Sequence, residues 1–282
     1  MSFASRLAVV ERRYGAPSAP LPWCAPVPFA RQCGMEPDLW QERVLLSTAP
    51  RLLLNCSRQS GKSQVTALLA LWTALFEPGS LVLLLSPSQR QSAELLRYVL
   101  RAYRVVAPQV PADAETLLRL ELANGSRILA LPGVEQTVRG LAGVTLLVLD
   151  EAARICDELY AATRPMLAVS GGRLVMLSTP WGRRGVFFEA WEHGDGWQRV
   201  QVTAEQCPRI SAQFLAEERA ALGPHIYARE YACEFQDADD AAFSGAAIAR
   251  MVTDDPPLWT SEELALPIEL HHQRVREQPR YG

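Results

Sequence analysis

The sequence predicts an α/β protein in which helices flank a mainly parallel β-sheet, with a small helical subdomain toward the C-terminus. Two observations lead to this prediction. Short apolar runs, typical of buried strands, alternate with longer stretches of good helix formers, and this alternation is the pattern of βαβ units. The chain of 282 residues is also 49% hydrophobic and 21% charged, which gives ample apolar material for a core.

The predicted elements follow in a regular order after a proline-rich start. Residues 15–37 carry six prolines, which indicates an extended arm or linker. The pattern then predicts strands at 51–55, 80–85, 117–122, 127–131, 145–149 and 173–177, and helices at 62–76 and 89–103. Asn124-Gly125 between two of these strands is a strong hairpin signal. The stretch 211–235 indicates two helices separated by Gly223-Pro224.

Charge and composition exclude several classes of protein. The net charge of -3 gives no global attraction to nucleic acid, so a contact with DNA requires a local basic patch. The six cysteines show neither C-x-x-C nor zinc-site spacing and read as reduced thiols. We find no apolar run long enough to span a bilayer and no signal-peptide order. The sequence therefore predicts a cytoplasmic protein without membrane contact.

The single lysine of the chain, Lys62, lies where a predicted strand gives way to a helix. The loop there resembles the pattern G-x-x-x-x-G-K-[ST], with Cys56 in place of the first glycine. We expect ATP phosphates to bind along this loop, which comprises Cys56, Ser57, Arg58, Gln59, Ser60, Gly61, Lys62 and Ser63. Lys62 would contact the β and γ phosphates, and the Ser63 hydroxyl would ligate Mg²⁺. The alternative is a chance Gly-Lys-Ser at a loop–helix junction.

Two carboxylates end the predicted strand at 145–149. Asp150 would hold the Mg²⁺ shell, and Glu151 would act as general base toward the attacking water. The alternative is a solvated acidic turn. Together with the loop, these residues predict a P-loop NTPase fold of the RecA/ASCE-like type, an enzyme that hydrolyses ATP with Mg²⁺.

The loop resembles that of the large terminase subunits of tailed bacteriophages, which carry an arginine in the loop and lack the usual first glycine. Four further segments resemble motifs of that family in the same order: Trp40-Gln41-Glu42-Arg43, Arg139-Gly140-Leu141, Ser178-Thr179-Pro180, and Glu230-Tyr231 through Phe235. The resemblance covers roughly residues 36–245. It implies a motor that moves double-stranded DNA into a viral capsid in a bacterial host cell. A homo-oligomeric ring on the viral portal is the implied assembly, with the small terminase subunit as a possible partner.

The resemblance also implies roles for individual residues. Trp40 and Gln41 would recognise adenine, and Thr179 would report the state of the γ-phosphate. Arg139 would reach the ATP of a neighbouring subunit, whereas Arg58 could act on the γ-phosphate in cis. For Arg58 and Arg139 a surface ion pair is the alternative, and for Thr179 a simple turn.

We expect four regions in the chain: the proline-rich arm over 1–37, which has no counterpart in the family, the ATPase core over 38–203, a helical lid over 204–245, and a tail or linker over 246–282. A complete large terminase continues into a nuclease domain. The acids after Phe243 do not follow predicted strands, so we expect no nuclease activity from this chain.

Four arginines of the helix at 89–103 and the residue after it share one face, since the offsets in sequence bring the other three within about 40° of the first. These are Arg90, Arg97, Arg101 and Arg104. The stripe could bind a DNA backbone, or it could be the solvated face of an amphipathic helix. Two alternatives to a packaging motor remain: a helicase of the DEAD/DEAH type, and a docking module without turnover left from a prophage gene.

Overall fold

The computed structural model describes residues 24–106, 110–134, 138 and 140–236. In this part of the chain eight strands form one sheet: β1 (Arg51–Cys56), β2 (Leu81–Ser86), β3 (Ala112–Glu115), β4 (Arg119–Leu122), β5 (Arg127–Pro132), β6 (Leu146–Asp150), β7 (Arg173–Ser178) and β8 (Gln198–Val202). The helices are α2 (Pro26–Gln32), α3 (Leu39–Leu46), α4 (Lys62–Phe76), α5 (Gln89–Val106), α7 (Asp157–Thr163), α8 (Gly185–Glu192) and α9 (Ala212–Glu230). Short 3₁₀ turns are η1 (Ala152–Arg154), η2 (Arg164–Leu167) and η3 (Ala204–Gln206).

The sheet is mainly parallel, as the sequence predicts. Its strand order is β3-β4-β5-β2-β6-β7-β1-β8, and only the pairs β3–β4 and β4–β5 are antiparallel. Strand β7 lies between β1 and β6, with Asn55 opposite Ser178 and Asp150 opposite Leu177. The carboxyl ends of three neighbouring parallel strands therefore meet at one edge of the sheet, which is where α/β proteins place their ligands.

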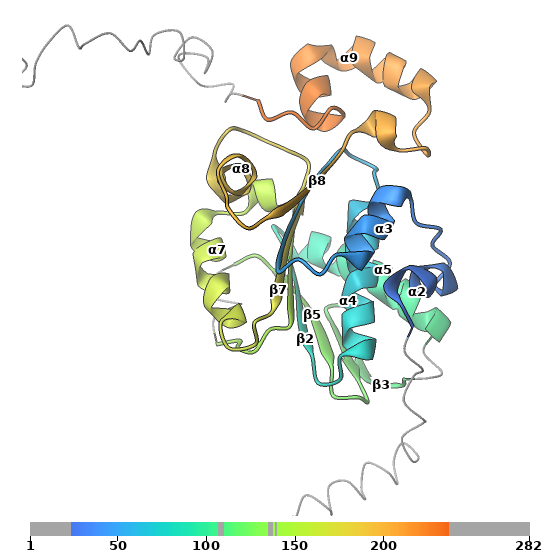
Figure 1. Ribbon diagram of the computed structural model, residues 1–282, viewed down its shortest axis with the longest axis vertical. Coiled ribbons are helices and arrows are strands. Elements are labelled where there is room, and N and C mark those ends of the chain that lie inside the picture. Colours follow the sequence, from blue (N-terminus) through green and yellow to red (C-terminus); the bar gives the residue numbers. More distant parts are fainter. Residues whose placement is uncertain (1–23, 107–109, 135–137, 139, 237–282) are drawn as a thin grey trace, which may run out of the picture. The chain divides into compact units, whose positions relative to one another are not determined.

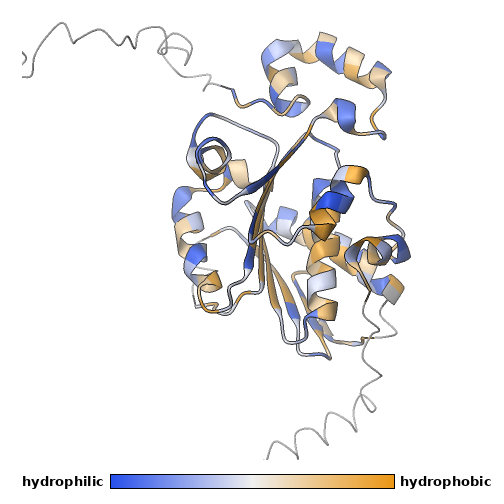
Figure 2. Ribbon diagram, in the orientation of Figure 1, coloured by the Kyte–Doolittle hydropathy of each residue, from blue (hydrophilic) through white to orange (hydrophobic). Residues whose placement is uncertain are grey.

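Helices cover both faces of the sheet (Figure 1). Side chains alternate between the faces along each strand. Leu52 and Leu54 of β1 join the core beneath α2, α3, α4 and α5, whereas Leu53 joins the opposite core with Phe187 of α8. Figure 2 shows hydrophobic residues gathered along the strands and on α4. Because the central strands are buried on both faces, they read in the sequence as continuous apolar runs.

Several predicted elements are confirmed with small shifts in their ends. Helix α4 has the predicted bounds, and β4 and β5 form the hairpin around Asn124-Gly125. Helix α9 is interrupted where predicted, because Gly223 has the non-helical angles φ 71° and ψ 165° and Pro224 follows it. No described helix has both the length and the apolar character needed to cross a bilayer.

The prediction of an extended arm over 15–37 is wrong for part of that range. Pro26–Gln32 form helix α2, whose first residue is a proline. Proline is favoured at the first helical position, because its missing N–H would have no partner there and its φ already suits the helix. Phe29 is buried and its ring meets that of Phe76 edge-on, at 5.7 Å between centroids. Burial of Phe29 favours a helix here, even though the proline content alone suggests an extended segment.

Candidate functional site

The predicted phosphate loop runs from the end of β1 to the start of α4. Gly61 caps α4 with φ 91°, a left-handed conformation that favours glycine. Cys56, by contrast, is the last residue of β1 and has no positive φ, so this position does not require the glycine of the common pattern. Burial raises the pKa of the Cys56 thiol to about 12, and it therefore stays a neutral side chain of the core.

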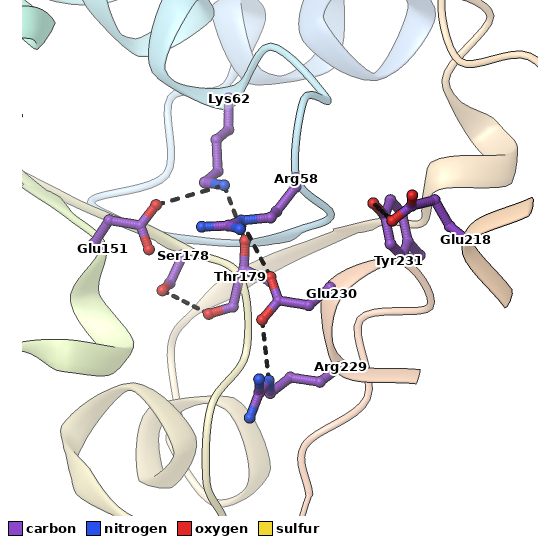
Figure 3. A network of polar contacts seen from close by, with 9 residues as sticks. All are labelled: Arg58, Lys62, Glu151, Ser178, Thr179, Glu218, Arg229, Glu230 and Tyr231. Atoms are coloured by element: carbon purple, nitrogen blue, oxygen red, sulfur yellow. Dashed lines mark hydrogen bonds and ion pairs between the residues drawn. The ribbon is translucent and has the colours of Figure 1, made fainter. Parts of the chain in front are cut away.

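Lys62 extends from the first turn of α4 to the ends of two other strands (Figure 3). Its Nζ donates a hydrogen bond to Thr179 Oγ1 at 3.1 Å and lies 3.7 Å from Glu151 Oε1. Lys62 is only 8% exposed. Its aliphatic chain is buried, and its ammonium group is held between Glu151 and Thr179, the residues that follow β6 and β7. The structure thus brings together three residues that the sequence assigns to one site.

Asp150 is the last residue of β6 and Glu151 follows it, but the two carboxylates have different surroundings. Burial, followed by the charge of Glu151, raises the pKa of Asp150 to about 7, although Lys62 and the Glu151 N–H oppose this shift. That N–H donates to Asp150 Oδ1 at 3.0 Å. Glu151 itself is partly exposed and has φ 52°, a strained conformation for a residue with a side chain. The turn directs one carboxylate inward and leaves the other at the surface of the site.

Arg58 lies on the outer side of the loop, next to the last residue of α9. Its side chain is 66% exposed and its Nε lies 3.2 Å from Glu230 Oε2. Its backbone N–H donates to the Glu230 carbonyl at 3.1 Å. Both residues line a pocket of about 430 Å³ together with Glu151 and Thr179. Arg58 therefore faces the same pocket as the predicted general base.

The two residues assigned to adenine recognition differ in position. Trp40 is part of the core beneath α3. Gln41 is buried beside the loop: its Oε1 accepts the Asp38 N–H at 2.9 Å, and a methyl group added to Gly61 would lie 2.8 Å from its Nε2. Gln41 therefore reaches the loop, whereas the ring of Trp40 stabilises the helix that carries Gln41.

The residues present fit ATP and Mg²⁺. The Oγ atoms of Ser57 and Ser60 are buried without a partner among the described residues, and the loop also supplies the buried ammonium of Lys62. The described residues contain no group of three or more His, Cys, Asp or Glu side chains able to hold a metal. An ion held by Ser63 and Asp150 would need phosphate oxygens and water as further ligands, which is the usual preference of Mg²⁺.

Other sequence predictions fall away from this pocket or outside the described part. Arg139 lies outside the described residues, as do the last residues of the expected lid (237–245) and the whole expected tail (246–282). The four arginines of α5 are exposed, and Leu95, Leu96, Val99 and Tyr103 of the same helix are buried. The predicted amphipathic orientation of α5 is therefore confirmed.

Three arginines that flank the site have no role in the sequence-based assignment. Arg154 and Arg229 lie over the two-ring side chain of Trp181, at 4.0 and 4.2 Å from its centroid. Arg209 contacts Asp38 and the Ser60 carbonyl. No local pattern in the sequence marks these pairs, because each joins segments far apart in the chain.

Comparison with known proteins identifies relatives of the chain and of its fold. Over 253 residues the chain is 26% identical to the large terminase subunit of Thermus virus P23-45, covering 77% of this chain and 52% of that protein. The chain thus spans about half the length of the curated relatives it matches. The fold resembles that of the large terminase ATPase domain of Thermus phage P74-26, with a TM-score of 0.66, 23% identity, and coverage of 74% of this chain and 97% of that one. It also resembles the large terminase of a thermophilic bacteriophage in complex with ADP, with a TM-score of 0.60 and 13% identity over 70% of this chain and 53% of that one.

These likenesses confirm the predicted P-loop fold of the ASCE type. The family model described as terminase large subunit, T4likevirus-type, N-terminal, matches residues 53–250, which is more than half of the 282 residues. The chain therefore belongs to the terminase large subunit family, of which it carries the N-terminal region.

Proposed function

We propose that this chain hydrolyses ATP in a Mg²⁺-dependent reaction that drives double-stranded DNA into a viral capsid. One observation carries the catalytic part of the proposal. The ammonium of Lys62 is held between Thr179 and Glu151, beside the buried carboxyl of Asp150, at the carboxyl ends of three adjacent parallel strands. The family membership supports the motor function.

Each residue has a role that follows from its position. Lys62 would neutralise phosphate charge, and the N–H groups of the loop would hold the phosphate oxygens. Ser63 and Asp150 would hold Mg²⁺, which supplies charge neutralisation at the phosphates when bound. Glu151 is the carboxylate nearest to Lys62 that remains partly exposed, so it is placed to orient water and accept its proton.

Arginine would complete the charge neutralisation. Arg58 is a candidate in cis, and it would have to exchange Glu230 for phosphate oxygens. Arg139 is the candidate in trans and acts only if subunits form a ring. Mixing Arg139→Ala with Glu151→Gln protein tests this assignment, because a mixed interface can pair an intact base with an intact arginine. Recovery of turnover supports Arg139 in trans, whereas no recovery in mixtures that co-assemble favours Arg58.

We further propose that the arginines of α5 contact the DNA backbone. The partners would be duplex DNA, further copies of the chain in a ring on the portal, and the small terminase subunit, all in the cytoplasm of the host cell. Backbone contacts bind DNA without reading its sequence, as a packaging motor requires.

The decisive experiment measures ATP turnover by the pure chain with and without Mg²⁺ and duplex DNA. Turnover that needs Mg²⁺ and persists on blunt duplexes without strand separation supports the proposal. Strand separation would favour the DEAD/DEAH-like helicase, and binding to portal without any turnover would favour the docking remnant. The same reactions, run on supercoiled plasmid, test our expectation that this chain does not cut DNA.

A further inference from the structure

Arg209 joins three segments that are distant in the sequence. It lies between η3 and α9, and its Nη1 donates to Asp38 Oδ1 at 2.9 Å. Its Nη2 lies 2.8 Å from Asp38 Oδ2 and donates to the backbone carbonyl of Ser60 at 2.8 Å. Through one guanidinium group, the segment that leads into α9 therefore binds both the residue that precedes α3 and the phosphate loop.

We propose that Arg209 is a positioning residue of the nucleotide site. Through the Arg209 clamp, by which we mean Arg209 with the Asp38 carboxylate and the Ser60 carbonyl, it fixes the phosphate loop in its binding conformation and anchors the start of α9 to that loop. This inference rests on the proposed ATP-binding function of the loop.

The Ser60 carbonyl matters because it belongs to the same peptide group as the N–H of Gly61, a residue of the phosphate loop. No cis peptide occurs among the described residues, so the C=O of Ser60 and the N–H of Gly61 point in opposite directions from one plane. Arg209 holds the carbonyl on the side of Asp38. The Gly61 N–H is thereby turned to the other side, where it is available to a phosphate oxygen. Without the clamp this peptide could rotate, since glycine tolerates many backbone conformations.

Asp38 organises both contacts on this side of the loop. Its backbone N–H is bound by Gln41 Oε1, and its carboxylate is bound by Arg209. A methyl group on Gly61 would lie 2.8 Å from Gln41 Nε2 and 3.4 Å from Arg209 Nη2, so both side chains flank the same loop residue. A guanidinium fork can serve the carboxylate and the carbonyl at once, whereas the ammonium of a lysine is a single point of contact.

The clamp lies next to the beginning of α9. Ser211, two residues beyond Arg209, caps this helix by accepting the Phe214 N–H at 3.2 Å. The clamp binds the C=O side of the Ser60–Gly61 peptide, opposite to the N–H that a phosphate oxygen would bind, so a phosphate there does not compete with Asp38 for Arg209. The clamp is therefore expected to persist when nucleotide binds, and it would act as the fixed end of α9.

A positional role can be separated from a stabilising one. The side chain of Arg209 is 48% exposed and that of Asp38 is 16% exposed, so loss of the pair leaves a carboxylate that water still reaches, and it costs the fold part of its stability without abolishing it. Arg209→Ala should therefore fold. The matched control is Arg219→Ala, which removes an arginine of α9 whose Nη2 lies 3.1 Å from Glu205 Oε1 and which contacts no residue of the phosphate loop.

The first test measures nucleotide binding and steady-state turnover. For Arg209→Ala we expect the Kd for ATP and the KM to rise about 10-fold with kcat changed less than about 3-fold, because an N–H that holds phosphate in the ground state and transition state alike contributes uniform binding. Arg209→Lys should recover only part of the affinity, and Arg219→Ala should match wild type. An Arg209→Ala protein with unchanged Kd and KM would overturn the inference.

The second test uses the nucleotide-free chain and measures amide hydrogen exchange. Arg209→Ala should speed exchange in the phosphate loop and in the first turn of α9, and Arg219→Ala should leave the loop unchanged. Unchanged exchange in Arg209→Ala would also overturn the inference. Failure of the proposed function has a separate signature, because the wild-type chain would then neither bind nor hydrolyse ATP whatever the exchange result.

Discussion

The two groups of charged residues that the sequence assigns to function occupy contrasting surroundings. At the nucleotide site, Lys62 and Asp150 are buried and contact residues from two other segments. On α5, all four arginines are exposed; Arg97 pairs with Glu94 in the preceding turn, and Arg104 lies 3.4 Å from Glu115. Burial of side chains from several segments holds them in one arrangement, and catalysis requires such a fixed arrangement. The exposed face of α5 determines only that its arginines point toward solvent, where their ionic contacts are screened by salt.

The largest effect is expected at the general base. Glu151→Gln should reduce turnover about 100-fold or more, with ATP affinity retained, because the amide keeps the shape of the carboxylate but cannot accept the proton. Single-turnover hydrolysis and ATP binding measured on the same preparation check this. Glu158→Gln, an exposed acid of α7, serves as control. Equal turnover in Glu151→Gln and wild type would remove Glu151 from the mechanism.

A smaller loss, and of a different kind, is expected from Lys62→Ala. Loss of the buried ammonium should weaken ATP binding by about 10- to 100-fold, since hydrogen bonds to charged groups are the strong ones. Equilibrium binding of a fluorescent ATP analogue measures the effect. Lys62→Arg keeps the charge and tests whether the length of the side chain matters. Undiminished affinity in Lys62→Ala would contradict the assignment of the loop.

Asp150→Asn should separate stability from activity. The folded chain keeps the Asp150 proton up to about pH 7, whereas an unfolded aspartate loses it near pH 4. The free energy of unfolding should therefore fall as the pH rises between these values, and stay low above them. At pH 8 we expect Asp150→Asn to be more stable than wild type by about 2 kcal/mol, yet inactive.

Urea unfolding of both proteins at pH 5 and pH 8 gives the comparison, with the exposed Asp195→Asn as control. The advantage of Asp150→Asn should shrink at pH 5. An advantage that is the same at both pH values would show that the burial of Asp150 does not set its ionisation.

The smallest effect is expected on α5. Each phosphate contact contributes about -0.9 to the slope of log affinity against log salt. Arg90 and Arg101 have no ion-pair partner among the described residues, unlike Arg97 and Arg104. Arg90→Ala/Arg101→Ala should therefore flatten the slope by nearly two units, and Arg97→Ala/Arg104→Ala by less. Basal ATPase should be unaffected. Slopes equal to that of wild type in both variants would leave α5 as a solvated face.

The sequence predicts the sheet and the centre of the site well because both follow from local patterns. The apolar runs of β1, β6 and β7 are continuous, and polar residues follow directly where those strands end. Strand β8 was not predicted: it lies at the edge of the sheet, and three of its five residues are Gln or Arg. Helix α2 could not be predicted from its proline content, because proline breaks a helix in its interior but is tolerated in its first turn.

The contacts around the site could not be predicted in the same way. Asp38 and Arg209 are 171 residues apart, and Arg58 meets Glu230 only because α9 returns to the phosphate loop. Such pairs depend on the path of the chain in space, and neither periodicity nor spacing encodes it.

The uniqueness of Lys62 has a practical consequence for protease chemistry. An endoprotease specific for lysine has one cutting position in the whole chain, after residue 62, in the first turn of α4. Because this lysine is buried in the folded protein, cleavage requires that the loop and the helix start open locally. The rate at which the chain splits into two fragments would therefore report the opening of the phosphate loop together with the start of α4, without any label or substitution.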